Sequence, residues 1–152
     1  MAIQVRDIMT RPVVYAQAET TLRELMDLLR ANRISGVPVV DEELRLVGVI
    51  SETDLICHDL AEGAEPQDTL SLKEGVLSVE RQYRIEELDR PVSDLMIRQV
   101  LTCELDDDIS SACKLFATYR VHRLVVMSQG EIAGILTPVD VVRAIAQGAI
   151  TP

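Results

Sequence analysis

The sequence predicts an α/β (α+β) fold built from two copies of one β-α-β-β-α unit, and three observations predict it. The segment that begins at Val5 matches the segment that begins at Val92, at an offset of 87 residues. In each copy, apolar residues recur at helical spacing. Each of these stripes is followed by two short apolar runs with a polar turn between them, which is typical of paired strands.

The internal repeat extends over most of both copies. Identical residues at an offset of 87 open each copy, and they are Val5, Asp7, Met9, Arg11 and Val13 against Val92, Asp94, Met96, Arg98 and Val100. One residue is lost in the turn near Glu43 and Gly130, after which Gly48 and Asp54 match Gly134 and Asp140 at an offset of 86. A unit of about 55 residues cannot bury its sheet and its helices alone. We therefore expect the two copies to pack around a pseudo-two-fold axis, with equivalent loops facing each other across a shared cleft.

The elements follow in the same order in each copy. The first helix is predicted from Leu22, Leu25, Met26 and Leu29, and from Ile109, Ala112, Cys113 and Phe116. Thr21 and Glu24 form a predicted N-terminal capping box. The strands are predicted at Val37–Val40, Leu46–Ile50, Leu124–Met127 and Ile132–Leu136, and a second helix begins near Thr53 and near Val139.

A connecting segment separates the copies, so that the predicted division is 1–61 for the first repeat, 62–91 for the connection and 92–152 for the second repeat. Gly63, Pro66 and Asp68 indicate a loop at its start. We expect the rest to be partly helical, because the spacing of its apolar residues suits a helix that packs on the protein or on a partner: Leu72, Val76, Val79 and Tyr83.

The composition excludes several classes of function. The net charge is −10 and aromatic residues make up 3% of the 152 residues, which argues against nucleic-acid binding and against an anionic membrane. No apolar run is long enough to span a membrane, and the N-terminus lacks the apolar core of a signal peptide. The three cysteines have no metal-like spacing, and we expect them to be reduced in a cytoplasmic protein: Cys57, Cys103 and Cys113.

Two pairs of motifs resemble the signature of the CBS (cystathionine-β-synthase-type) domain. They are RISGVPVVD (33–41) with GVISETDL (48–55), and VHRLVVM (121–127) with GILTPVDV (134–141), each after a V-x-D-[IL]-M opening. The second repeat is also similar to the γ subunit of AMP-activated protein kinase. The resemblance implies tandem CBS repeats, often dimeric, which regulate a partner by binding AMP, ADP, ATP or S-adenosylmethionine without doing chemistry.

Each repeat carries a hydroxyl residue followed by an aspartate at the start of its second helix, Ser51 with Asp54 and Thr137 with Asp140. Both pairs suit a helix cap, and Pro138 suits the first helical position. The same helix start can receive a phosphate, and a carboxylate can accept both ribose hydroxyls. The resemblance assigns the two aspartates to ribose and Ser51 and Thr137 to phosphate.

The remaining predicted site residues are not equivalent in the two repeats. His122 and Arg123 could contact phosphates, whereas the first repeat has Ser35 and Gly36 at these positions. An apolar slot for adenine is implied by the resemblance, with a packing role as the alternative for each residue: Met9, Val14, Ile34, Met96, Leu101 and Val121. The resemblance further implies that a site can be built across the repeats, with Met9, Val14, Ile34 and Ser35 grouped with Thr137 and Asp140.

These observations favour a non-catalytic sensor of an adenine nucleotide, with a role in energy sensing. No P-loop, nucleophile elbow or HExxH-like metal motif is present, and His58 and His122 stand apart from other ligand types. We therefore expect no catalytic cofactor and no metal site. The alternatives are an S-adenosylmethionine sensor and a ligand-free module for dimerisation or partner docking. We also expect a homodimer.

Overall fold

The computed structural model describes residues 3–55, 68–73, 76–81 and 88–150. In the first repeat, a three-stranded sheet has the order β1(Ala16–Gln17)-β2(Gly36–Val40)-β3(Leu46–Ser51), with β1 parallel and β3 antiparallel to β2. The second repeat has the same topology in β6(Thr102–Glu104)-β7(Leu124–Ser128)-β8(Glu131–Leu136). Both sheets carry a register shift at the equivalent place, after Val39 and after Val126. The predicted fold class is confirmed.

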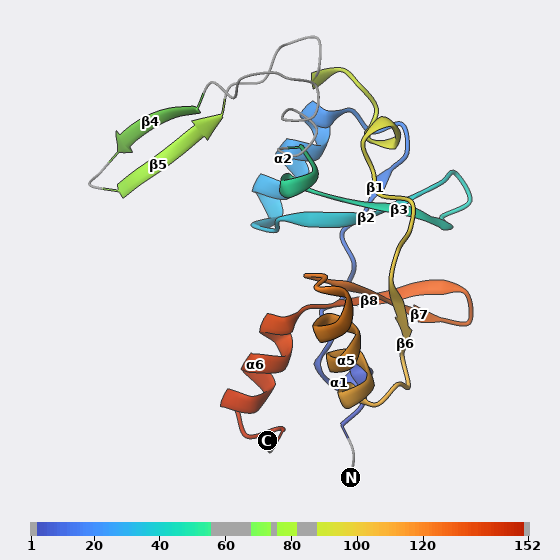
Figure 1. The fold of residues 1–152 in the computed structure, drawn as a ribbon. Coiled ribbons are helices and arrows are strands. Elements are labelled where there is room, and N and C mark those ends of the chain that lie inside the picture. Colours follow the sequence, from blue (N-terminus) through green and yellow to red (C-terminus); the bar gives the residue numbers. More distant parts are fainter. Residues whose placement is uncertain (1–2, 56–67, 74–75, 82–87, 151–152) are drawn as a thin grey trace.

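The helices lie on the outer sides of the two sheets, which face the middle of the molecule (Figure 1). They are α2(Leu22–Asn32) in the first repeat and α5(Ile109–Tyr119) and α6(Pro138–Ala146) in the second. Residues 52–55 of the first repeat are also helical. The predicted capping box of α2 is present, since Thr21 accepts a hydrogen bond from the backbone N–H of Glu24 and the Glu24 carboxylate accepts one from that of Thr21. This carboxylate has a pKa below its usual value because it accepts hydrogen bonds from the backbone and side chain of Thr21.

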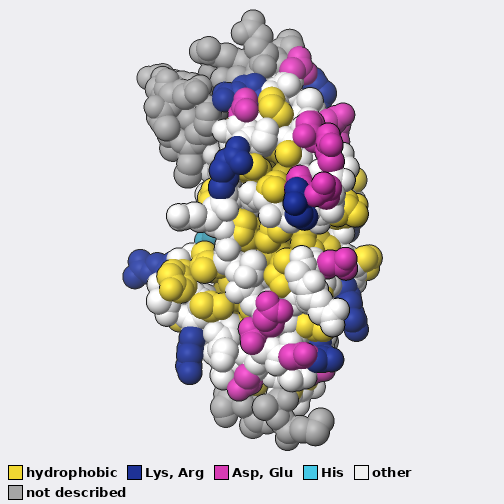
Figure 2. All heavy atoms as spheres, turned by 90° about the vertical axis from the view of Figure 1, so that its right-hand side faces the viewer, with side chains coloured by type: hydrophobic (Ala, Val, Ile, Leu, Met, Phe, Trp, Pro, Cys, Tyr) yellow, Lys and Arg dark blue, Asp and Glu magenta, His cyan; other side chains and the backbone are white. Residues whose placement is uncertain are grey.

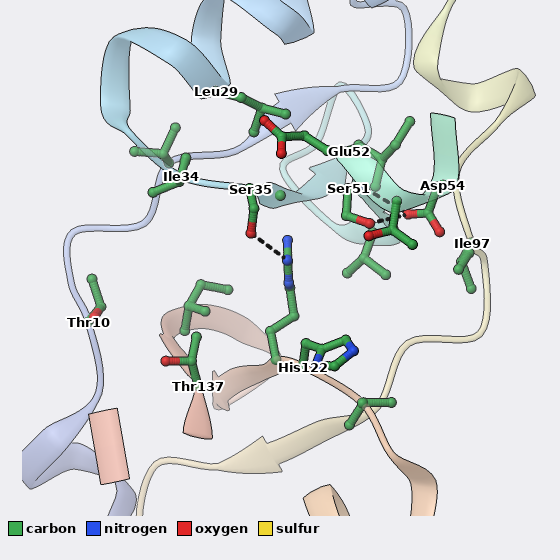
Figure 3. A pocket seen from close by; sticks show the side chains of 18 of the residues that line it. Thr10, Leu29, Ile34, Ser35, Ser51, Glu52, Asp54, Ile97, His122 and Thr137 are labelled. Carbon is green, nitrogen blue, oxygen red and sulfur yellow. Dashed lines mark hydrogen bonds between the residues drawn. The ribbon is translucent and has the colours of Figure 1, made fainter. Parts of the chain in front are cut away.

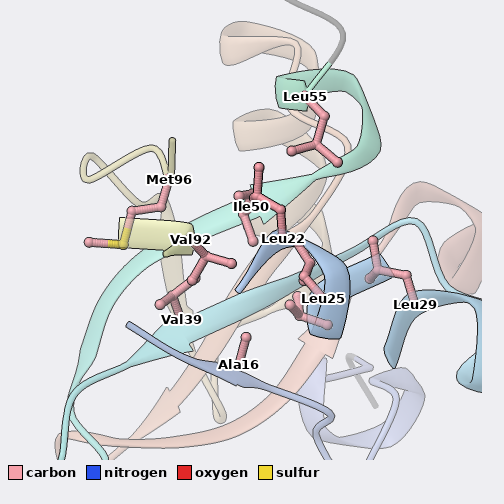
Figure 4. Close-up of a cluster of buried hydrophobic side chains, with 10 residues drawn as sticks. Ala16, Leu22, Leu25, Leu29, Val39, Ile50, Leu55, Val92 and Met96 are labelled. Atoms are coloured by element: carbon pink, nitrogen blue, oxygen red, sulfur yellow. The ribbon is translucent and has the colours of Figure 1, made fainter. Parts of the chain in front are cut away.

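The opening segment of each repeat packs on the opposite repeat. The short helix α1(Val5–Ile8) lies beside α6 and β8 and contributes Val5 to the core of the second repeat. The short 3₁₀ helix η1(Val92–Asp94) contributes Val92 to the core of the first repeat, next to Val39 and Ile50 (Figure 4). Because each repeat completes the core of the other, the two form one folding unit rather than two separable domains.

Two backbone pairings reinforce this exchange. Thr10 exchanges backbone hydrogen bonds with Ile135 of β8, at N···O distances of 2.8 and 3.1 Å. Ile97 pairs in the same way with Val49 of β3, at 2.8 and 2.9 Å. The two pairings are equivalent under the repeat offsets, which supports the expected pseudo-two-fold arrangement. They bring the chain that leaves each opening segment to the edge of the other sheet.

The connecting segment differs from the expectation. Its described part is a two-stranded antiparallel sheet, β4(Asp68–Lys73) and β5(Val76–Arg81), so the predicted helix is wrong there. Tyr83 lies outside the described residues. Apolar and polar residues alternate from Thr69 to Lys73, which is typical of a strand. The apparent helical spacing arose because Leu72 and Val76 were counted as residues of one helix, whereas they lie on two different strands that pair with each other.

Candidate functional site

A cleft with a volume of about 1930 Å³ lies between the two repeats and is lined by residues of both. All but two of the predicted site residues line it: Val14, Ile34, Ser35, Ser51, Asp54, Leu101, Val121, His122, Arg123, Thr137 and Asp140. Apolar side chains gather across the middle of one face of the molecule, whereas acidic and basic side chains are scattered above and below (Figure 2). The cleft exceeds the several hundred Å³ that a typical small ligand occupies.

Met9 and Met96 are the two exceptions, since neither is among the residues that line the cleft. Each is only 9% exposed and belongs to the core of the opposite repeat. The Met9 sulfur lies against Gly134, where an added Cβ would be 2.5 Å from it, and the Met96 sulfur lies against Gly48 in the same way, at 2.7 Å. Their placement in the cores follows from the exchange of the opening segments, which the sequence pattern does not reveal.

Asp140 is held tightly at the start of α6. One carboxylate oxygen, Oδ2, accepts hydrogen bonds from the Thr137 N–H and hydroxyl, both at 2.8 Å. The other, Oδ1, accepts from the Arg143 guanidinium at 3.2 Å and from the Thr10 hydroxyl at 3.4 Å. Pro138 occupies the first turn, as expected, and the Thr137 hydroxyl accepts from the Asp140 N–H. The capping role of this pair is therefore present.

Asp54 occupies the equivalent place in the first repeat. Its Oδ2 accepts from the Ser51 N–H at 2.7 Å and from the Ser51 hydroxyl at 2.9 Å. Within the described part of the chain, Oδ1 has no hydrogen-bond partner. Ser51 and Asp54 lie close together on one side of the cleft, away from Thr10 and Thr137 (Figure 3). The two halves of the cleft thus share one motif but differ in its contacts.

Arg123 extends from the second repeat across the cleft to the first. Its Nη2 donates to the Ser35 hydroxyl at 3.1 Å, whereas its Nη1 is buried without a hydrogen-bond partner. Burial lowers the pKa of this guanidinium, and the negative charges of Asp54 and Glu52 act in the opposite direction. The guanidinium lies so close to Gly36 that an added Cβ there would overlap it. Gly36, which sequence reasoning treated only as a missing charge, therefore makes room for Arg123.

Sequence reasoning missed several polar residues of the cleft: Thr10, Arg30, Arg33, Glu52 and Arg120. Arg33 and Arg120 end α2 and α5 in the left-handed conformation, each with φ of 53°, which is uncommon for a residue other than glycine. Their equivalence at an offset of 87 residues was a signal in the repeat alignment that could have found them.

The described part of the chain contains neither a cluster of metal-binding side chains nor a helix that could span a membrane. No group of three or more His, Cys, Asp or Glu side chains is arranged to hold a metal ion among residues 3–55 and 88–150 or the hairpin. None of the described helices combines the length and the apolar character needed to cross a membrane.

Comparison with known proteins identifies the two repeats. The sequence model described as "CBS domain" matches residues 5–60 and 92–147. The uncharacterized protein MJ1426 of Methanocaldococcus jannaschii is 32% identical over 93% of this chain and 90% of its own length. The chloroplastic CBS domain-containing protein CBSX1 of Arabidopsis thaliana is 34% identical over 84% of this chain, which spans 57% of that protein.

Solved structures agree with this assignment. The structure of CBSX2 in complex with AMP matches 97% of this chain and 98% of its own, with a TM-score of 0.72 and 26% identity. The CBS domain pair of MJ0100, in complex with 5-methylthioadenosine and S-adenosyl-L-methionine, has a TM-score of 0.73 at 21% identity and coverage of 97% and 99%, which shows the shared fold. This chain therefore belongs to the CBS domain family, as a tandem pair of CBS domains.

Proposed function

We propose that this CBS pair is a non-catalytic regulatory module that binds an adenine nucleotide, AMP, ADP or ATP, in the cleft between its repeats. The observation that carries the proposal is the buried Nη1 of Arg123, which lacks a hydrogen-bond partner in the cleft. A buried N–H group without a partner costs about 1–3 kcal/mol, and more when it is charged. A phosphate oxygen would relieve that cost with a charge-assisted hydrogen bond.

The charge of the cleft supports an anionic ligand. The chain has a net charge of −10, yet four arginines and three carboxylates line the cleft. S-adenosylmethionine offers one carboxylate to Arg123 but also carries a positive sulfonium and a positive ammonium group, so a nucleotide phosphate suits this cation better. The apolar residues that line the cleft offer surface for the base: Val14, Ile34, Leu101 and Val121. CBSX2, a structural relative, is described in complex with AMP.

The test compares AMP with adenosine in calorimetric titrations of ligand-stripped protein. Arg123→Ala should weaken AMP binding about ten- to a hundredfold, because it removes a charge-assisted hydrogen bond of about 1.5–3 kcal/mol. Adenosine binding should change little, since adenosine has no phosphate. Arg45→Ala is the matched control, because Arg45 is an exposed residue that pairs with Asp41 and Glu43 away from the cleft.

Two results would contradict the proposal. One is the absence of any binding of AMP, ADP or ATP at millimolar concentration, which would favour a ligand-free docking module. The other is tighter binding of S-adenosylmethionine than of AMP. Competition between AMP and ATP for the same cleft would extend the proposal to energy sensing.

We further propose that the protein is a homodimer and that it regulates a protein partner in the cytoplasm. Helix α6 exposes Val139, Val142 and Ile145, an apolar face that a second copy could cover. Light scattering should then give twice the mass of one 16.9 kDa chain. The mass of a single chain at micromolar concentration would contradict the dimer while leaving nucleotide binding intact.

A further inference from the structure

The two halves of the cleft carry the same motif in two different states. In both, the Oδ2 atom of the aspartate accepts two hydrogen bonds from the residue that caps the helix, Thr137 for Asp140 and Ser51 for Asp54. The difference lies in the other oxygen, Oδ1. This atom decides whether a carboxylate can accept hydrogen bonds from a ligand, because Oδ2 is already occupied in both halves.

The Oδ1 atom of Asp140 is occupied from both repeats. Arg143, one turn further along α6, donates to it at 3.2 Å, and Thr10 of the first repeat donates at 3.4 Å. The residue is only 6% exposed, so few directions of approach remain. A ligand that needed this oxygen would have to displace a hydrogen bond to a charged group, which is among the stronger hydrogen bonds in proteins.

The Oδ1 atom of Asp54 has no such partner among the described residues. The residue equivalent to Thr10 is Ile97, at an offset of 87, and its side chain has no hydroxyl to donate. Ile97 lies on the same side of the cleft as Ser51 and Asp54, whereas Thr10 and Thr137 lie on the other side (Figure 3). Asp54 is also only partly buried, and it lines the cleft.

The positive charge of Arg123 also favours nucleotide binding in the half of the cleft that contains Asp54. Arg123 reaches the first repeat, where it bonds to Ser35 and lies within the electrostatic reach of Asp54 and Glu52. The same cation therefore interacts electrostatically with the carboxylate whose Oδ1 accepts no hydrogen bond from the described residues. A nucleotide needs an acceptor for its two ribose hydroxyls and a cation for its phosphate, and this half supplies both.

We propose that the ribose of a bound nucleotide is held by Asp54 and not by Asp140, so that the chain binds one AMP, in the half of the cleft formed by Ser51, Asp54 and Arg123. Asp140 then serves as a structural link that joins α6 to the first repeat through Thr10. The inference rests on the proposed function, since it states which half of the same cleft is used.

The test titrates AMP into the wild type and into two variants that are matched by the pseudo-two-fold axis. The wild type should bind one AMP per chain. Asp54→Asn should weaken AMP binding about ten- to a hundredfold, because the neutral amide loses the charge that holds the ribose hydroxyls. Asp140→Asn should leave the AMP affinity within about threefold of the wild type and should lower the melting temperature instead.

A second pair of variants keeps the test decisive if Asp140→Asn does not fold. Thr10→Val and Arg143→Gln each remove one donor to Asp140 Oδ1 without touching Asp54, and both should leave AMP affinity within about threefold. The inference is overturned if Asp54→Asn binds AMP normally, if Asp140→Asn or either donor variant loses tenfold, or if two AMP molecules bind per chain. Failure of the wild type to bind AMP would instead overturn the proposed function itself.

Discussion

Met9→Ala tests whether the exchanged opening segments hold the two repeats together. The Met9 side chain is 9% exposed, packs among the core residues of the second repeat and lies against Gly134. Truncation of a buried methionine to alanine costs about 2–5 kcal/mol, from lost burial and from the cavity left behind. Because Met9 keeps some exposure, we expect a value near the lower end, about 2–3 kcal/mol.

The melting temperature should fall accordingly. For a chain of this size, each kcal/mol lowers it by about 2–4 °C, so Met9→Ala should lower it by roughly 4–12 °C. Thermal and urea unfolding should be measured at one protein concentration, because a dimer would make the melting temperature concentration-dependent. Leu44→Ala is the control, since Leu44 is 56% exposed between β2 and β3, away from the proposed dimer face, and should change stability by no more than about 0.5 kcal/mol.

The same variant separates a core role from a ligand role. If Met9 belongs to the core, calorimetry should show AMP affinity little changed while stability falls. An unchanged melting temperature combined with a tenfold loss of AMP affinity would refute the packing argument and place Met9 at the ligand.

Three further predictions concern other parts of the molecule. Gly36→Ala should displace Arg123 and weaken AMP binding about tenfold by calorimetry, with some loss of stability because the new methyl would also lie 2.8 Å from a backbone oxygen of β3. Thr137→Ala should lower the free energy of unfolding in urea by about 0.5–2 kcal/mol, because it removes a helix cap and a donor to Asp140; no change would show that the cap is dispensable. Burial raises the pKa of the Cys103 thiol from 9.0 to about 11, so unfolding should release a proton at pH 9–11 and stability should fall with rising pH in that window. Cys103→Ser should flatten that pH dependence, and an equal slope in both proteins would contradict the assignment.

Much of the fold could be predicted from the sequence because its signals are local. The helix stripe beginning at Leu22, the capping box of Thr21 and Glu24, and the paired apolar runs each involve residues within a few positions of one another. The repeat doubled every one of these signals and identified the equivalent residues of the two halves. The connecting segment was misjudged because a short apolar pattern fits both a helix and a pair of strands, and only the pairing of β4 with β5 distinguishes them.

The candidate site was predicted less completely, for a different physical reason. The sequence identified the hydroxyl-aspartate pairs and the cation, since these follow from the motifs alone. It did not place Met9 and Met96, because whether an apolar residue faces a cleft or a core depends on which repeat its segment packs against.

The repeat, the topology of each unit and the types of residue at the helix starts all follow from the sequence. The differences between the two units depend on contacts between residues far apart in the chain. The bond from Arg123 to Ser35 spans 88 residues, and the bond from Thr10 to Asp140 spans 130. Contacts at such separations follow no periodicity, since they exist only once the two repeats have exchanged their opening segments and closed the cleft between them.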